Sequence, residues 1–215
     1  MVKTPAPPPT TIFLVRHGQT ATTGKVLPGR ARGLHLADVG RDQAERAADR
    51  IAQVPNVDAV YTSPLERARE TAAPIGRAAG HKPQVDRGLL ECDFGEWTGA
   101  SLRRLMRKQE WATVQRAPSS FRFPGGESFT EMQMRIVTAL ERLRAAHPGG
   151  RIVCVSHADP IKAAVAHALG THLDLFQRIV ISPCSISTIA WSNGGPVVLG
   201  VNSTDRPLSE FVGTP

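Results

Sequence analysis

The chain has 215 residues, enough for one α/β domain that folds without a disulfide or a metal, and its 41% hydrophobic content is near the globular average. Its net charge of +7, in which arginine dominates, indicates an anionic partner: nucleic acid, a membrane surface or a small anionic substrate. No run of 18 apolar residues is present, which argues against a transmembrane helix, and three scattered cysteines are typical of a reduced, cytoplasmic protein.

The two ends of the chain differ from its middle in composition. Four prolines in residues 1–10 predict a disordered, extended arm, and this arm lacks the apolar segment of a signal peptide. Residues 203–215 have no periodicity and are expected to form a loose tail. Residues 11–202 are therefore expected to form a single domain.

Strand and helix patterns alternate through the first part of this domain. Residues 11–15 are an apolar run typical of a buried strand. A helix is predicted over residues 38–53, with Asp38 as its N-cap and Val39 on the apolar side with Ala44, Ala47 and Ile51. Residues 57–63 predict a second strand.

The following helix is expected to begin at Ser63-Pro64 and to end at Gly80. Further along, Ser128 and Glu131 have the spacing of a capping box ahead of an amphipathic helix.

The second half continues the alternation. Residues 151–157 predict a third strand, and a helix is expected from Asp159-Pro160 to Gly170. Two more strands are predicted over residues 185–191 and 196–202. The alternation predicts a three-layer α/β/α sandwich with a mostly parallel central sheet.

Residues 92–127 do not follow this alternation. Residues 101–111 are compatible with a short helix, and the segment that follows is rich in Pro and Gly and reads as a loop. Such an insertion often covers an active site, so we expect residues 92–127 to form a lid.

Charged side chains follow three predicted strands, at the sheet edge where α/β proteins bind ligands. Arg16 and His17 follow the first strand, Ser63 and Arg67 follow the second, and His157 follows the third. Taken singly, each of these residues would more often have a structural role or simply be exposed to solvent. Together, two arginines, two histidines and helix N-termini would suit a phosphate group.

A proton donor for a leaving alkoxide is also available, because Glu91 follows the apolar pair Leu89-Leu90.

Six segments then resemble, in order, the motifs of the histidine phosphatase superfamily, the group with cofactor-dependent phosphoglycerate mutases and fructose-2,6-bisphosphatases. These segments are LVRHGQT, GLHLADVGRDQA, YTSPLERARETA, LLECDFGEWTG, FPGGES and VSHADPIKAAV, and the resemblance covers about residues 11–170. It implies a phosphoglycerate mutase-like fold.

The resemblance also implies roles for individual residues. His17 would accept the phosphoryl group, Arg16, Arg67 and His157 would hold it, and Glu91 would be the acid/base. The positions at the strand ends, and the position of Glu91 after an apolar pair, point to the same five residues without the resemblance.

Residues around this set are candidates for binding the substrate. Thr23 stands where the family often has Asn, so a shorter hydroxyl would donate there, and Ala158 replaces the usual Gly but keeps its backbone N–H. Specificity is expected from residues 92–127 and from around His35 and Arg30. The complete set of substrate-binding candidates is Gly18, Gln19, Thr20, Thr23, Arg30 and Ala158.

Other chemistries lack their residue patterns. None of the three cysteines is followed by the Arg of a Cys-x5-Arg phosphatase, and there is no GxxxxGK[ST] loop. The seven histidines include no His-x-His or His-x-x-x-His pair, so neither a metal nor another cofactor is expected.

A nucleic-acid-binding module is the best rival from another class. It would use the basic residues Arg103, Arg104, Arg107 and Lys108 on one short helix. Aromatic residues for base stacking are scarce nearby, so we interpret this patch first as a solvated face, second as a lid facing the substrate and third as a nucleic-acid site.

The sequence thus predicts a metal-independent phosphatase that hydrolyses a phosphomonoester through a phosphohistidine on His17. In this mechanism His17 is neutral and His157 is protonated. The segment CDFGEWTGASL favours the phosphatase branch over the alternative, a phosphoglycerate mutase-like phosphomutase. A protein that binds phosphorylated ligands without turnover is a weaker alternative.

The expected partner is a phosphorylated small molecule, with no specific nucleic acid and no membrane. The oligomeric state stays open, a homodimer being one option.

Overall fold

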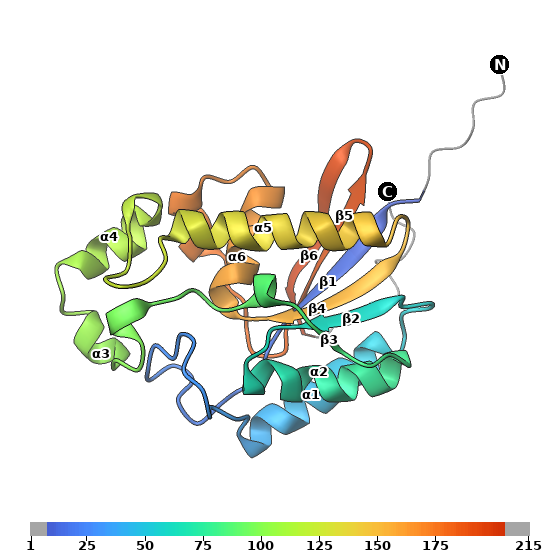
Figure 1. Cartoon of the computed structure of the whole chain (residues 1–215), viewed down its shortest axis with the longest axis horizontal. Helices are drawn as coiled ribbons and strands as arrows, with labels where there is room; N and C mark the ends of the chain where they lie inside the picture. Colours follow the sequence, from blue (N-terminus) through green and yellow to red (C-terminus); the bar gives the residue numbers. More distant parts are fainter. Residues whose placement is uncertain (1–7, 205–215) are drawn as a thin grey trace.

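The computed structural model of the protein describes residues 8–204. Its centre is a six-stranded sheet with the order β3-β2-β4-β1-β5-β6 (Figure 1). The strands are β1 (Thr10–Arg16), β2 (Ala59–Thr62), β3 (Gln84–Val85), β4 (Arg151–Ser156), β5 (Ile186–Ser192) and β6 (Gly195–Ser203). Pairs β1–β4, β2–β4 and β2–β3 are parallel, whereas β5 is antiparallel to both neighbours. The predicted, mostly parallel sheet is confirmed.

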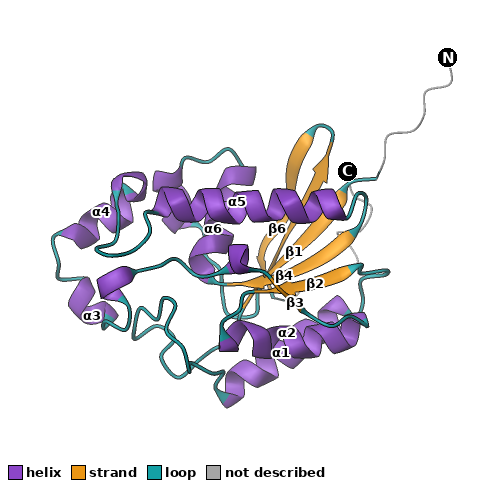
Figure 2. Cartoon of the chain, in the orientation of Figure 1, coloured by secondary structure: helices purple, strands orange, loops and turns teal. Residues whose placement is uncertain are grey.

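Helices cover both faces of the sheet, as Figure 2 shows. Ile12 and Leu14 pack with the side that carries α5 (Phe129–Ala146) and α6 (Ala158–Ala168). Phe13 and Val15 pack with the side that carries α1 (Asp38–Ile51) and α2 (Glu66–Ala79). Because successive side chains of a strand point to opposite faces, the apolar run of β1 fills both cores. The predicted three-layer sandwich is confirmed.

The parallel register fixes where the functional residues lie. Arg16, the last residue of β1, pairs with Ser156, the last residue of β4, and Thr62 at the end of β2 pairs with Val155. The three strands therefore end at one edge of the sheet, and the residues that follow them meet there.

Several predicted boundaries move by a few residues. α1 begins at Asp38 with Ala37 as N-cap, and Val39 is 44% exposed instead of facing the core. α2 begins at Glu66, not at Ser63-Pro64, and ends as predicted at Gly80, which has φ +72°. The predicted capping box of α5 is present.

The predicted arm and tail lie mostly outside the described residues, which exclude residues 1–7 and 205–215. Within the described part, β1 already begins at Thr10, whose buried hydroxyl donates to the backbone oxygen of His147 at 2.9 Å. Ser203 is the last residue of β6 and not part of a loose tail.

The segment over residues 92–127 lies beyond one end of the sheet, at the left of Figure 1. It carries two short helices, α3 (Leu102–Leu105) and α4 (Glu110–Arg116), where one short helix is predicted. Phe94, Trp97 and Phe123 pack edge to face in its core, so the segment is anchored by aromatic contacts. In residues 8–204 no helix is long and apolar enough to cross a membrane.

Candidate active site

His17 and His157 come together at the carboxyl ends of β1 and β4, with ring centroids 5.1 Å apart. His17 Nδ1 lies 2.7 Å from the backbone oxygen of Gly18, to which it donates as Nδ1–H. This hydrogen bond leaves Nε2 unprotonated. Burial, Arg67 and Arg16 hold the pKa of His17 well below its ordinary value, so the ring is neutral at pH 7.

The loop that carries His17 packs tightly against the start of α1. A Cβ on Gly18 would lie 2.4 Å from the backbone oxygen of Gly40, and one on Gly40 would lie 2.0 Å from the backbone oxygen of Gln19. The Gly18 N–H donates to the Thr71 hydroxyl at 3.0 Å. Gly18 and Gln19 therefore fix the loop, and neither lines the pocket as a substrate-binding residue would.

Two buried guanidinium groups flank His17. Arg67 is fully buried, donates from Nε to His17 Nε2 at 3.3 Å and from one terminal nitrogen to the Gly29 oxygen at 2.7 Å. Arg16 donates to the Ile181 oxygen at 2.6 Å. Arg67 Nη1 and Arg16 Nε have no hydrogen-bond partner within residues 8–204. Buried N–H groups without partners are costly, and an anion at this position would satisfy them.

His157 follows β4 as the N-cap of α6 and is fully buried. Its Nε2 shares a hydrogen bond of 2.8 Å with the Ser63 hydroxyl, and its Nδ1 lacks a partner in the described chain. Burial and the charge of Arg67 hold its pKa well below the ordinary value, so on the protein's own charges the ring is neutral. The predicted protonated state of His157 is thus not that of the protein alone, and it needs the negative charge of a bound phosphoryl group.

Glu91 is buried in the same pocket and accepts a hydrogen bond from the Cys92 N–H at 2.9 Å. Burial first, and then the charge of Asp159, raise the pKa of Glu91 to about 7. A carboxyl group with this pKa exchanges its proton near neutral pH, as a general acid/base requires.

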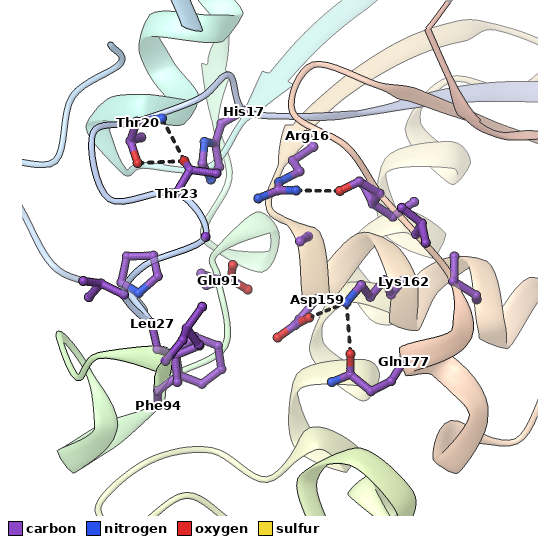
Figure 3. Close-up of a pocket in the computed structure, with 18 residues that line it drawn as sticks. Arg16, His17, Thr20, Thr23, Leu27, Glu91, Phe94, Asp159, Lys162 and Gln177 are labelled. Atoms are coloured by element: carbon purple, nitrogen blue, oxygen red, sulfur yellow. Dashed lines mark hydrogen bonds and ion pairs between the residues drawn. The ribbon is translucent and has the colours of Figure 1, made fainter. Parts of the chain in front are cut away.

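These residues border a cavity of about 350 Å³ (Figure 3). Six predicted site residues line it, namely Arg16, His17, Thr20, Thr23, Glu91 and Ala158. Arg67 and His157 contribute from fully buried positions against His17. Phe94 and Leu102, from the predicted lid, also line the cavity.

The hydroxyl of Thr23 is engaged within its own loop. It accepts a hydrogen bond from the Thr20 N–H at 2.9 Å and lies 3.0 Å from the Thr20 hydroxyl. Thr20 and Thr23 therefore act as a pair at the pocket wall, where Figure 3 shows them beside His17.

Arg30 differs from its predicted role, because it does not line the pocket. Its guanidinium donates to the backbone oxygen of Glu91 at 2.9 Å and pairs with Asp93 at 3.3 Å and Glu127 at 2.8 Å. These carboxylates neutralise its charge, and its contact with the Glu91 oxygen holds the Glu91 backbone in place. His35 likewise pairs with Glu70 and lies outside the pocket.

Three polar pocket residues are absent from the predicted set. Lys162 Nζ lies 3.3 Å from Asp159 and 3.0 Å from the Gln177 side-chain oxygen, across the pocket from Leu27 and Phe94 (Figure 3). Asp159 and Lys162 belong to the VSHADPIKAAV segment, and their spacing of three residues on a helix was the available signal.

The basic residues of the rival nucleic-acid interpretation, Arg103, Arg104, Arg107 and Lys108, are exposed. The Lys108 ammonium lies 5.4 Å from the Trp97 ring centroid, in a cation–π contact. In the described part of the chain, no group of three or more His, Cys, Asp or Glu side chains is arranged to hold a metal ion.

Known proteins share this architecture. The Phosphoserine Phosphatase of Entamoeba histolytica, solved in complex with 3-Phosphoglyceric Acid, is 27% identical with a TM-score of 0.82, over 91% of this chain and 98% of that one. The YhfR protein of Bacillus stearothermophilus is 26% identical with a TM-score of 0.84, over 91% and 98% of the two chains.

Sequence relatives cover the chain to a similar extent. Phosphoserine phosphatase 1 of Hydrogenobacter thermophilus is 30% identical over 93% of this chain and 95% of its own length. The Bifunctional protein Rv2228c of Mycobacterium tuberculosis is 32% identical over 91% of this chain, which spans 54% of that protein. The family model of the histidine phosphatase superfamily (branch 1) matches residues 12–204. The chain therefore belongs to the histidine phosphatase superfamily.

Proposed function

We propose that this protein hydrolyses phosphomonoesters of small molecules through a phosphohistidine on His17. The observation that carries the proposal is the state of His17, a buried imidazole whose Nδ1 donates to Gly18, so that Nε2 is unprotonated and accepts a hydrogen bond of 3.3 Å from the Arg67 guanidinium. Two relatives named as phosphoserine phosphatases support this type of reaction.

In the first step, His17 Nε2 attacks phosphorus in line, and the bond from phosphorus to the ester oxygen breaks. Glu91 in its protonated form gives its proton to the departing alkoxide. The partnerless N–H groups of Arg16 and Arg67 bind the phosphoryl oxygens, whose charge favours protonation of His157.

In the second step, water attacks the phosphohistidine with ionised Glu91 as its base. The P–N bond breaks, phosphate is released and His17 becomes neutral again. The raised pKa of Glu91, about 7, suits both halves of this cycle.

The test is the replacement His17→Ala, assayed with an activated aryl phosphate and by acid-labile ³²P labelling of the protein. The variant should lose both turnover and label, because no second acceptor is expected. His167→Ala, on the C-terminal turn of α6, is the matched control and should keep both. Activity of His17→Ala above a few per cent of wild type would contradict the proposal, provided that circular dichroism shows a folded variant.

The same assay distinguishes hydrolysis from phosphoryl transfer between hydroxyl groups. Run with 3-phosphoglycerate, a phosphatase releases inorganic phosphate, whereas a mutase forms 2-phosphoglycerate. Formation of the isomer in excess of phosphate would favour the mutase. The cytoplasmic location and the homodimer stay predictions.

A further inference from the structure

We propose that the alcohol released from the substrate carries an apolar extension, alkyl or aryl, that occupies a second cavity beside the catalytic pocket. This inference rests on the proposed phosphatase activity and names the substrate class for the same site. It concerns the part of the substrate beyond the ester oxygen, because the proposed mechanism places the phosphoryl group against Arg16, Arg67 and His17.

The second cavity has a volume of about 220 Å³ and shares a wall with the catalytic pocket. Five residues line both cavities, namely Leu27, Phe94, Leu102, Asp159 and Gln177. The two cavities are therefore adjacent, and we infer that a group extending from the catalytic pocket past Phe94 and Leu102 reaches the second cavity. The catalytic pocket alone, about 350 Å³, reaches the size range of small-molecule sites, roughly 300–1,000 Å³.

The remaining lining of the second cavity is almost entirely apolar. It consists of Met106, Trp111, Val114, Gln115, Phe123 and Phe129. Phe123 and Phe129 are fully buried and belong to the main core, with ring centroids 5.1 Å apart, so this wall is rigid. Met106 stands at the rim and is 58% exposed. Such a surface favours burial of hydrocarbon over water.

The charges around the two cavities disfavour a carboxylate on the alcohol. Lys162 is paired with Asp159 and Gln177, and Arg30 is paired with Asp93 and Glu127 outside the pocket. Among the described lining residues, this leaves Arg16 as the one cation without a carboxylate partner, and the phosphoryl group uses it. A carboxylate group on the alcohol would therefore lie near the carboxylate of Asp159, with no unpaired cation to neutralise it.

The experiment compares kcat/KM for ethyl, butyl and hexyl phosphate, with 3-phosphoglycerate as the carboxylated comparator. All four release alkoxides, so each needs the proton of Glu91. We expect kcat/KM to rise by about fourfold per added methylene until the cavity is filled, the factor that burial of one CH₂ gives. 3-Phosphoglycerate should fall below butyl phosphate.

Two matched variants locate the effect. Met106→Trp places a larger side chain at the rim of the second cavity and should flatten the dependence on chain length. Met134→Trp makes the same change at a 66% exposed position on α5 that lines neither cavity, and it should retain the wild-type dependence. Both positions are exposed, so both variants should fold.

The outcomes separate the two proposals. Equal kcat/KM for the three alkyl phosphates, a preference for 3-phosphoglycerate, or an unchanged length dependence in Met106→Trp would each overturn the inference. Absence of the His17 phosphoenzyme with every ester, an aryl phosphate included, would instead overturn the proposed function.

Discussion

At the scale of single residues, the site is a set of charged and polar groups whose pKa values are shifted mainly by burial. Burial and the two guanidinium groups keep His17 neutral, and burial raises the pKa of Glu91 to about 7, so its protonated and ionised forms are both present near neutral pH. One environment thus lowers the pKa of a histidine and raises that of a carboxyl, since it disfavours each charged form. These two shifts support the proposed roles of His17 as the nucleophile and of Glu91 as the acid.

The replacement Glu91→Gln should distinguish leaving groups. An alkyl phosphate leaves as a basic alkoxide and needs the proton, so kcat should fall by about 10²- to 10⁴-fold. A nitrophenyl phosphate leaves without help, so phosphorylation of His17 should change much less and a burst of nitrophenolate should appear. Rapid-quench kinetics with both esters measures this. An equal loss on both, without a burst, would assign the acid to another carboxylate.

The pH profile provides the control for this assignment. The first step needs protonated Glu91, so wild-type kcat/KM for an alkyl phosphate should fall as the pH rises through about 7. Glu91→Gln lacks this titrating carboxyl group, so the part of the descending limb that Glu91 causes should be lost in the variant. A limb that persists in the variant would belong to a different group.

At the scale of elements, the catalytic loop is built by the contact between β1 and the first turn of α1. Glycines at positions 18 and 40 let the two backbones approach closely, and neither position has room for a Cβ. The N–H of Gly18 is bonded to Thr71 of α2, which in turn donates to the backbone oxygen of Arg67. The loop of His17 and the helix of Arg67 therefore hold each other in register.

The substitution Gly18→Ala should disturb this contact. Its methyl group would lie 2.4 Å from a backbone oxygen, which cannot rotate away, so we expect a loss of stability of about 1–3 kcal/mol and a larger loss of activity. Gly194→Ala is the control, because its nearest atom is the Ser192 hydroxyl at 3.5 Å. Urea unfolding and aryl phosphate turnover report both effects. Wild-type values for Gly18→Ala would mean that the loop tolerates displacement.

At the scale of the whole molecule, the sheet edge collects positive charge for a phosphate and the segment over residues 92–127 closes one side of the cavity. Phe94 and Leu102 from this segment line the same cavity as Asp159 and Gln177, which come much later in the sequence. The pocket is therefore assembled from distant parts of the sequence.

A chelator tests how the phosphoryl charge is neutralised. Arginine and imidazole groups surround the phosphoryl position, so activity toward an aryl phosphate should be the same with and without millimolar EDTA. Vanadate, which adopts the geometry of in-line transfer, should inhibit. A preparation that loses activity in EDTA and regains it with a divalent cation would contradict this prediction.

The α/β sandwich, the strand-end position of the candidate catalytic residues and the family could all be predicted from the amino-acid sequence. These depend on local patterns: the apolar run of β1, the capping box at Ser128 and six short motifs. Boundaries such as the start of α2 moved, because a Ser-Pro pair suits a turn before a helix as well as its first residues.

The ion pairs of Arg30, the raised pKa of Glu91 and the wall of the pocket formed by Asp159, Lys162 and Gln177 became apparent in the folded structure. Arg30 has the charge of a substrate ligand, yet Asp93 and Glu127 neutralise it from more than 60 residues away. Glu91 owes its pKa to burial and to Asp159, which comes from another strand end. Such properties depend on which distant side chains meet and on how much water they exclude, and no local pattern records either.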